Sequence, residues 1–278
     1  MAHPAVAVLE SALRARKLDR TLTTTLPSWE WTDPSSLLPT DIPLVDACLR
    51  GGLPRGQLSE LTGACSSGRM TLLLQLMAAA TRRGEIAALV DTLDCFDVAS
   101  AAAAGVDLDR LLWIRGSGSG IRGSGLGALG SETQNTRTQN ARTRNMEAWT
   151  PDPESRIPSP VDRALKALNL VLQAGGFGIV AIDLADVPAM TLRQIPFTTW
   201  PRVQRVIEGS DTACVLVTPE PLARSAGGLT LSLAGGSAWA GASDRSHVLK
   251  GLDVRVRVVS PRKRIDGDVH VRVSACVP

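Results

Sequence analysis

Gly63-Ala-Cys-Ser-Ser-Gly68-Arg69-Met70-Thr71 follows the spacing of the phosphate-binding pattern G-x-x-x-x-G-K-[ST]. An apolar segment that fits a strand, Gln57 to Leu61, precedes it. A second apolar segment, Thr71 to Ala80, follows it and fits a helix. The glycines permit a tight loop whose backbone N–H groups face an anion at the amino end of that helix. This arrangement predicts an α/β fold of the nucleotide-binding kind.

Two residues at the end of the loop depart from the pattern. Arg69 replaces the phosphate-binding lysine, and its planar guanidinium is broader than an ammonium group. Met70 replaces the hydroxyl that would hold Mg²⁺, and a thioether is a poor ligand for a hard cation. Thr71 does not readily substitute, because one helical position turns it about 100° away. We therefore expect no ATP hydrolysis and no required cofactor, although ATP binding without turnover stays compatible with the loop. The loop could also persist only because the strand-to-helix turn needs its glycines.

Length and composition bound the class of protein. A chain of 278 residues with 44% apolar content can bury one large core, and its net charge of +3 does not by itself indicate nucleic-acid binding. No run of 18 apolar residues and no signal-peptide core is present in the sequence. The five cysteines form no C-x-x-C pair, which favours a reduced, cytoplasmic protein without a zinc site.

Strands and helices alternate along the chain, which predicts a mostly parallel sheet. The strand that ends at Asp183 has the form of a Walker B element, in which an acid follows a buried strand. We expect the helix after it to break at Pro201. The predicted elements are helices at Leu44–Leu49, Thr71–Arg83, Val98–Ala104 and Val161–Ala174, and strands at Ile86–Val90, Leu111–Ile114, Gly178–Asp183 and Ala213–Val217.

Three further segments flank or interrupt this core, which we place at residues 41–278. Residues 1–20 contain a short amphipathic helix, and residues 21–40 read as an extended connector. Residues 115–160 pass from Gly-Ser to Thr-Gln-Asn-Arg repeats and are expected to be a disordered insertion. The side chains that favour self-association, or equally packing on their own core, are Leu9, Leu13, Trp29 and Trp31.

Two late segments, Val254–Val259 and Val269–Val273, alternate polar and apolar residues and predict a β-hairpin with a basic tip. Alternation puts Arg255 and Arg257 on one face of a strand. A solvated sheet face and a surface for DNA or an acidic partner are both compatible with this pattern. The tip adds Arg262, Lys263 and Arg264.

The order of elements from about residue 40 onward resembles the core of the RecA recombinases, with the insertion as an interruption. The segments that carry the resemblance are Thr40–Asp46, Gly51–Gly56, Gly63–Gly68, Gly105–Leu112 and Val254–Arg264. The resemblance implies a RecA-like P-loop NTPase core with an N-terminal helix and a C-terminal β-hairpin, and without RecA's small C-terminal domain.

The same resemblance assigns roles to several positions. RecA carries a catalytic glutamate soon after its second core strand, and Leu93 falls there, with Asp94 as the neighbouring carboxylate if the alignment shifts by one residue. RecA holds DNA with two mobile loops, which correspond to Asp186–Thr199 and Pro219–Gly228. Each carries a single cation, Arg193 or Arg224, so DNA binding through them would be weak.

A closer resemblance is to the ImuA family of RecA-like proteins in bacterial SOS mutagenesis. Matching features include Leu13–Arg20, the tryptophan-bearing connector, Glu208–Cys214, Pro219–Gly228 and Leu252–Val259. The resemblance implies a DNA-damage-induced accessory protein of error-prone translesion synthesis. Its implied partners are ImuB (an inactive relative of Y-family polymerases), RecA, an error-prone replicative-type polymerase and, weakly, single-stranded DNA.

Two other classes of protein compete with this interpretation. A DNA-dependent ATPase of recombinase type would have to tolerate Arg69 and Met70, and turnover of ATP with single-stranded DNA would reveal it. A cell-division inhibitor of the SulA type also has a RecA-like fold, and binding to FtsZ would distinguish it. Such inhibitors are shorter and lack the phosphate-loop frame that this chain retains.

Overall fold

The computed structural model describes residues 33–116, 158–223, 228–240, 248–260 and 268–274. The predicted amino-terminal helix with Leu9 and Leu13, the pair Trp29 and Trp31, and most of the predicted insertion lie outside these ranges. Arg224 and the predicted hairpin tip with Arg262, Lys263 and Arg264 also lie outside them.

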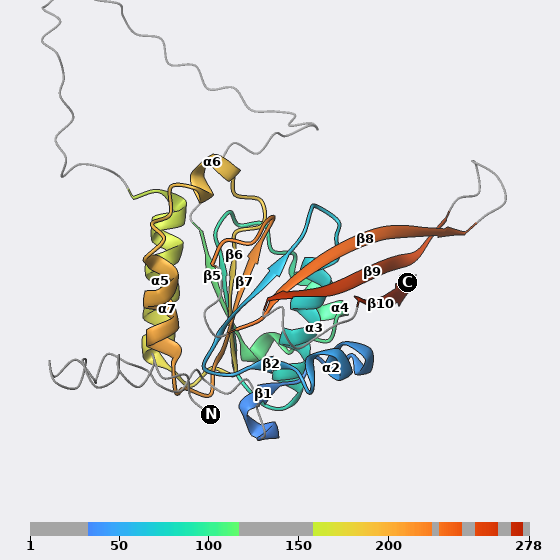
Figure 1. The fold of residues 1–278 in the computed structure, drawn as a ribbon, viewed down its shortest axis with the longest axis horizontal. Helices are drawn as coiled ribbons and strands as arrows, with labels where there is room; N and C mark the ends of the chain where they lie inside the picture. The colour runs from blue at the N-terminus through green and yellow to red at the C-terminus, as the bar shows by residue number, and fades with distance from the viewer. Residues whose placement is uncertain (1–32, 117–157, 224–227, 241–247, 261–267, 275–278) are drawn as a thin grey trace, which may run out of the picture.

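An eight-stranded sheet runs through the centre of the described structure (Figure 1). Its strands pair in parallel from β8 across to β5, whereas β8, β9 and β10 pair antiparallel at the other edge. The inner strands are buried on both faces, which explains why they read as continuous apolar runs. In spatial order the strands are β10 (Asp268–Ser274), β9 (Val248–Ser260), β8 (Thr230–Ala240), β3 (Leu58–Thr62), β7 (Ala213–Thr218), β6 (Ile179–Asp183), β4 (Ala87–Asp91) and β5 (Leu111–Arg115).

Helices cover both faces of this sheet and divide the core into two clusters (Figure 1). One cluster packs α2 (Pro43–Leu49), α3 (Arg69–Arg82) and α4 (Val98–Ala103) on one face. The other packs α5 (Pro160–Ala174), α6 (Ala189–Leu192) and α7 (Thr199–Ile207) on the opposite face. Two short 3₁₀ helices, η2 (Pro34–Ser36) and η3 (Leu108–Arg110), lie at its periphery. The mixed, mostly parallel sheet between helical layers is the α/β architecture that the alternation predicts.

The helices differ from the sequence expectations mainly at their ends. The helix α3 begins at Arg69 rather than Thr71, so Arg69 belongs to its first turn. The helix α5 begins at Pro160, and Ser159 caps it in a capping box with Asp162. The break expected at Pro201 is wrong, because Pro201 lies in the first turn of α7, where no intrahelical N–H bond is lost.

The predicted late hairpin is confirmed, but its neighbour β8 was not anticipated. The register joins Val256 to Val269 and Val254 to Val271. The strand β8 alternates apolar and polar residues at first and then runs into Gly235 and Gly236, residues that weaken a strand signal. Its position is fixed by pairing with β3 on one side and β9 on the other.

A two-stranded ribbon closes the amino ends of the large sheet. In it β1 (Leu37–Leu38) pairs antiparallel with β2 (Leu53–Pro54). Leu38 is fully buried in the core, so the core includes residues of the segment expected as a connector. Gly52 has a φ of +137°, and a Cβ there would lie 2.1 Å from the Leu38 carbonyl oxygen, so only glycine fits this turn.

Arg55, which follows β2, ties this ribbon to three parts of the sheet. Its guanidinium donates to the carbonyl oxygens of Leu37 (3.2 Å), Gly178 (3.3 Å) and Asp211 (2.8 Å). It also donates to Glu85 Oε1 at 2.7 Å. A planar five-donor group is suited to satisfying several fixed acceptors at once.

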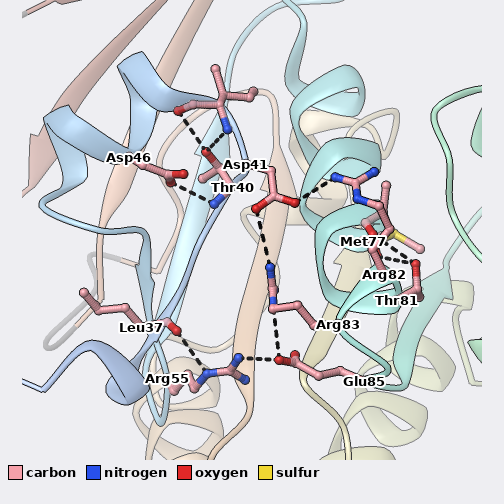
Figure 2. Close-up of polar contacts among 12 residues, drawn as sticks. Leu37, Thr40, Asp41, Asp46, Arg55, Met77, Thr81, Arg82, Arg83 and Glu85 are labelled. Atoms are coloured by element: carbon pink, nitrogen blue, oxygen red, sulfur yellow. Dashed lines mark hydrogen bonds and ion pairs between the residues drawn. The ribbon is translucent and has the colours of Figure 1, made fainter.

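Figure 2 shows that this contact continues as a chain of charges. Arg83 Nε lies 3.3 Å from the same Glu85 oxygen, and Arg83 also pairs with Asp41. Arg82 pairs with Asp41 at 2.8 Å. The inner end at Arg55 is partly buried, and the outer end at Asp41 and Arg82 is exposed to solvent.

We expect Arg55→Met to lower the free energy of unfolding by about 2–4 kcal/mol, because it removes one donor from the Glu85 carboxylate and from the carbonyl oxygens of Leu37, Gly178 and Asp211. The matched control Arg82→Met should cost less than about 1 kcal/mol, since exposed ion pairs contribute little. The Arg55 side chain is 12% exposed and that of Arg82 is 47% exposed. Urea unfolding measures both, and equal losses would contradict the role given to Arg55.

Candidate functional site

The glycine-rich loop joins β3 to α3 with the geometry that its spacing predicts. Ser66 and Gly68 adopt left-handed backbone conformations, with φ of +61° and +90°. Gly68 is the residue before α3, and no side chain caps the first N–H groups of the helix. Ser67 is buried, and its hydroxyl has no hydrogen-bond partner among the described residues. The loop is thus a tight turn that leaves the first N–H groups of α3 without a side-chain cap.

Arg69 turns its buried guanidinium onto the protein itself. Its Nη1 donates to the carbonyl oxygen of Gly63, the first residue of the loop. Its Nη2 donates to the carbonyl oxygen of Ala185 (3.2 Å) and to Asp186 Oδ1 (3.3 Å), both of which follow β6. The group that stands in the lysine position therefore links the two ends of the loop and joins it to the next element of the site.

Neither Met70 nor Thr71 places a hydroxyl where the phosphate-binding pattern has the one that would hold Mg²⁺. Met70 is partly buried and packs against the apolar core. Thr71 lines a cavity of about 370 Å³ between α2, α3 and the strands β8 to β10. Asp183 lines a different, smaller hollow. Because the two residues face different spaces, the structure does not bring Thr71 and Asp183 together as a site for a cation.

Two acids end neighbouring strands at that smaller hollow. Asp91 on β4 and Asp183 on β6 are partners in the parallel register. Asp91 accepts hydrogen bonds from the backbone N–H groups of Cys95 (3.0 Å) and Phe96 (2.9 Å) and from Trp113 Nε1 (3.2 Å). Asp91 is thus occupied in holding the turn after β4, a role that the sequence interpretation missed.

The environment of Asp183 favours its neutral form. Burial raises the pKa of Asp183 to about 6, and the carboxylates of Asp91 and Asp186 act in the same direction. A hydrogen bond of 2.9 Å from the Ala185 N–H and the Arg69 guanidinium oppose that rise in pKa. Asp183 therefore takes up a proton more readily than an ordinary aspartate, and a pKa of about 6 leaves it mostly ionised at pH 7.

The position aligned with a catalytic glutamate offers no carboxylate to the site. Leu93 lines the hollow together with Asp91 and Asp183. Asp94, the alternative carboxylate, has a φ of +59° and forms a bidentate pair with Arg115, at 2.8 Å for both contacts. Leucine at this place can neither accept a proton from water nor orient it.

The outer side of the loop is packed against the antiparallel strands. A Cβ at Gly235 on β8 would lie 2.6 Å from the Ser66 carbonyl oxygen. A Cβ at Gly68 would lie 2.6 Å from Val254 Cγ2 on β9. These glycines permit a close approach of strand and loop, which gives a physical reason for glycines within β8.

The predicted cationic surface is only partly within the described residues. Arg255 and Arg257 lie exposed on one face of β9, opposite the buried Val254, Val256 and Val258. Across the register they face Ala234 and Ser232 of β8 on one side, and His270 and Asp268 of β10 on the other. Arg193 is exposed after α6, beyond β6, and the strands β7, β3 and β8 separate β6 from β9. The structure therefore does not gather these arginines into one patch.

Within the described ranges, no group of three or more His, Cys, Asp or Glu side chains is placed to hold a metal ion. No described helix is both long and apolar enough to cross a lipid bilayer.

Comparison with known proteins relates part of this chain to RecA. Residues 35–120 match the family model of the RecA N-terminal domain. Protein RecA of Nostoc punctiforme is 47% identical over 68 residues, which cover 24% of this chain and 19% of that relative. Protein RecA of Symbiobacterium thermophilum is 43% identical over 77 residues, covering 27% and 22%. Protein RecA of Chlorobium limicola is 48% identical over 62 residues, covering 22% and 18%.

Residues 35–120 of this chain are similar to the RecA N-terminal domain. The matched region runs from η2 to just beyond β5 and contains the loop, Arg69, Asp91 and Leu93. The mostly parallel sheet with helices on both faces is consistent with a RecA-like fold. The matches span about a fifth of the length of these RecA relatives.

Asp183→Asn should remove a pH dependence from folding. The folded pKa of about 6 exceeds the ordinary value of 3.8, so the folded state binds more protons than the unfolded state between these pH values. The wild-type free energy of unfolding therefore falls as pH rises through this window, and the loss persists above it.

We expect the free energy of unfolding of Asp183→Asn, relative to wild type, to rise by up to about 3 kcal/mol between pH 4 and pH 7. The exposed control Asp109→Asn should show little change over the same range. Chemical denaturation at a series of pH values measures both differences. A difference for Asp183→Asn that stays constant with pH would contradict the raised pKa.

Proposed function

We propose that this chain is a non-hydrolysing RecA-like accessory protein of the SOS-induced, error-prone translesion synthesis machinery, of the ImuA type. It acts through contacts with other proteins rather than through turnover of ATP. The resemblance described above suggests ImuB, RecA and an error-prone replicative-type polymerase as its partners, with weak binding of single-stranded DNA as an accessory activity.

The observation that carries the proposal is the engagement of Arg69. Its guanidinium is buried and bound to the carbonyl oxygens of Gly63 and Ala185. A phosphate group would have to compete with these contacts for the guanidinium, and displacing it would leave two carbonyl acceptors without that donor. In this arrangement the Arg69 guanidinium stabilises the strand-to-helix turn rather than binding a phosphate group.

The other positions of the site support the same conclusion. Met70 supplies no hydroxyl, Leu93 supplies no carboxylate, and Asp94 is held by Arg115. Hydrolysis would require a cation, a base and an oriented water, and each of these lacks its residue here.

The exposed face of β9 is the surface that we assign to an acidic partner or to DNA. Arg255 and Arg257 point to the same side of the strand, and the facing residues of β8 are small. Guanidinium groups on an exposed strand face can bind a phosphate backbone or an acidic protein surface.

Capture of the purified ImuB-type protein and of RecA by this chain tests the proposal. We expect capture of at least one of them without nucleotide and no change on addition of ATP and Mg²⁺. Arg255→Glu/Arg257→Glu should reduce capture at least tenfold, as expected when charge pairs are replaced by repulsion. The control Arg202→Glu/Arg205→Glu reverses two exposed arginines of α7 and should leave capture unchanged. Failure to capture either protein, or capture that depends on ATP, would contradict the proposal.

A further inference from the structure

A wide cavity opens at the amino ends of the strands, at the opposite end of the sheet from the glycine-rich loop. Its volume is about 970 Å³, which is large enough for bulky side chains. Residues just before β4, β6 and β7 line it, namely Ile86, Gly178 and Thr212. We call it the basal cavity. The charged chain of Figure 2 contributes Arg55, Arg83 and Glu85 to its wall.

Glycines keep the basal cavity open. At Gly84, Gly175 and Gly176, a Cβ atom would have no other atom within 4 Å. All three line the cavity. Ile86 beside them is 45% exposed, so a large apolar side chain faces solvent there. The wall thus combines unfilled space with uncovered apolar surface, the two features that an apolar occupant would use.

The rim of the cavity carries arginines that are paired with acids, since Arg83 pairs with Glu85 and Arg110 pairs with Asp107. Arg83 and Arg110 both line it, and Arg110 is tethered by donating to the Gly84 carbonyl oxygen at 2.7 Å. Guanidinium groups attract the faces of tryptophan rings more strongly than those of other aromatic side chains. They also pair with carboxylates. An occupant that carries both tryptophan and an acid would complement this rim.

The described chain begins at the edge of the same cavity. Ser35, Leu37 and Pro39 line it. The residues immediately before the described start include Trp29-Glu30-Trp31. Trp31 is four residues from Ser35 and Trp29 is six, which gives a reach of at most about 14 Å and 21 Å. The segment that carries two tryptophans around an acid is therefore tethered at the mouth of an open, apolar and arginine-rimmed cavity.

We propose that Trp29 and Trp31 dock into the basal cavity of their own chain. Two tryptophan side chains supply a large apolar area, and the open wall beside Ile86 and Gly176 would receive it. The short tether gives an effective concentration in the millimolar range, which favours the same chain over a second copy. The proposal does not depend on whether the chain binds or hydrolyses ATP, because the basal cavity and the glycine-rich loop lie at opposite ends of the sheet.

Fluorine NMR of the full chain labelled with 5-fluorotryptophan tests this docking, with Trp29→Phe and Trp31→Phe used to assign the two resonances. In the wild type we expect both resonances to differ clearly from their positions in urea. Ile86→Glu places a charge in the cavity wall and should move both most of the way to the urea positions. Arg110→Ala, on the rim, should move them in the same direction.

The matched control is Met190→Glu, which alters an exposed apolar side chain on α6, beyond the other end of the sheet. It should leave both resonances in place, and circular dichroism checks that every variant is folded. The proposal would be overturned if neither Ile86→Glu nor Arg110→Ala moves the resonances of Trp29 and Trp31. Wild-type resonances that approach the urea positions on dilution would also overturn it, because they would indicate docking into a second copy.

Discussion

The hydrogen bonds of the Arg69 guanidinium to the carbonyl oxygens of Gly63 and Ala185 connect the loop, the first turn of α3 and the segment after β6. In this chain the cation at the end of the glycine-rich loop is a structural group. Its contacts are buried, where a hydrogen bond to a charged donor is worth more than at the surface. The hollow beside this link is lined by Leu93 and by acids. One of these acids, Asp91, accepts hydrogen bonds from backbone N–H groups.

The two ends of the sheet hold arginine in similar ways. At the carboxyl ends of the strands Arg69 satisfies carbonyl groups of the loop and of β6, and at the amino ends Arg55 satisfies those of Leu37, Gly178 and Asp211. Both guanidinium groups donate to backbone carbonyl oxygens of several chain segments and so hold those segments together. With these two arginines holding turns of the fold, the surface that we propose for partners is the exposed face of β9, and the basal cavity is assigned to the chain's own Trp29 and Trp31.

The order of elements could be predicted because buried parallel strands leave continuous apolar runs, as in Ile179 to Asp183 and Ala213 to Thr218. The loop could be located because its glycine spacing is specific. The strand β8 was missed because Gly235 and Gly236 obscure its alternation, and the reason for Gly235 is a contact with the loop more than 160 residues earlier in the chain. The partners of Arg69, Arg55 and Asp91 are likewise distant in sequence or lie on the backbone, so no local pattern marks them.

The measurement that tests the central claim most directly is ATP binding and hydrolysis by the purified full chain, with and without single-stranded DNA. Arg69→Lys/Met70→Thr restores the loop pattern, and Arg202→Lys/Met190→Thr makes the same chemical changes at exposed positions as a control. We expect no turnover by the wild type or the control under either condition, and a gain of ATP binding only in the loop variant. Turnover by the wild type that single-stranded DNA stimulates would contradict the account and would make the chain an active RecA-like ATPase.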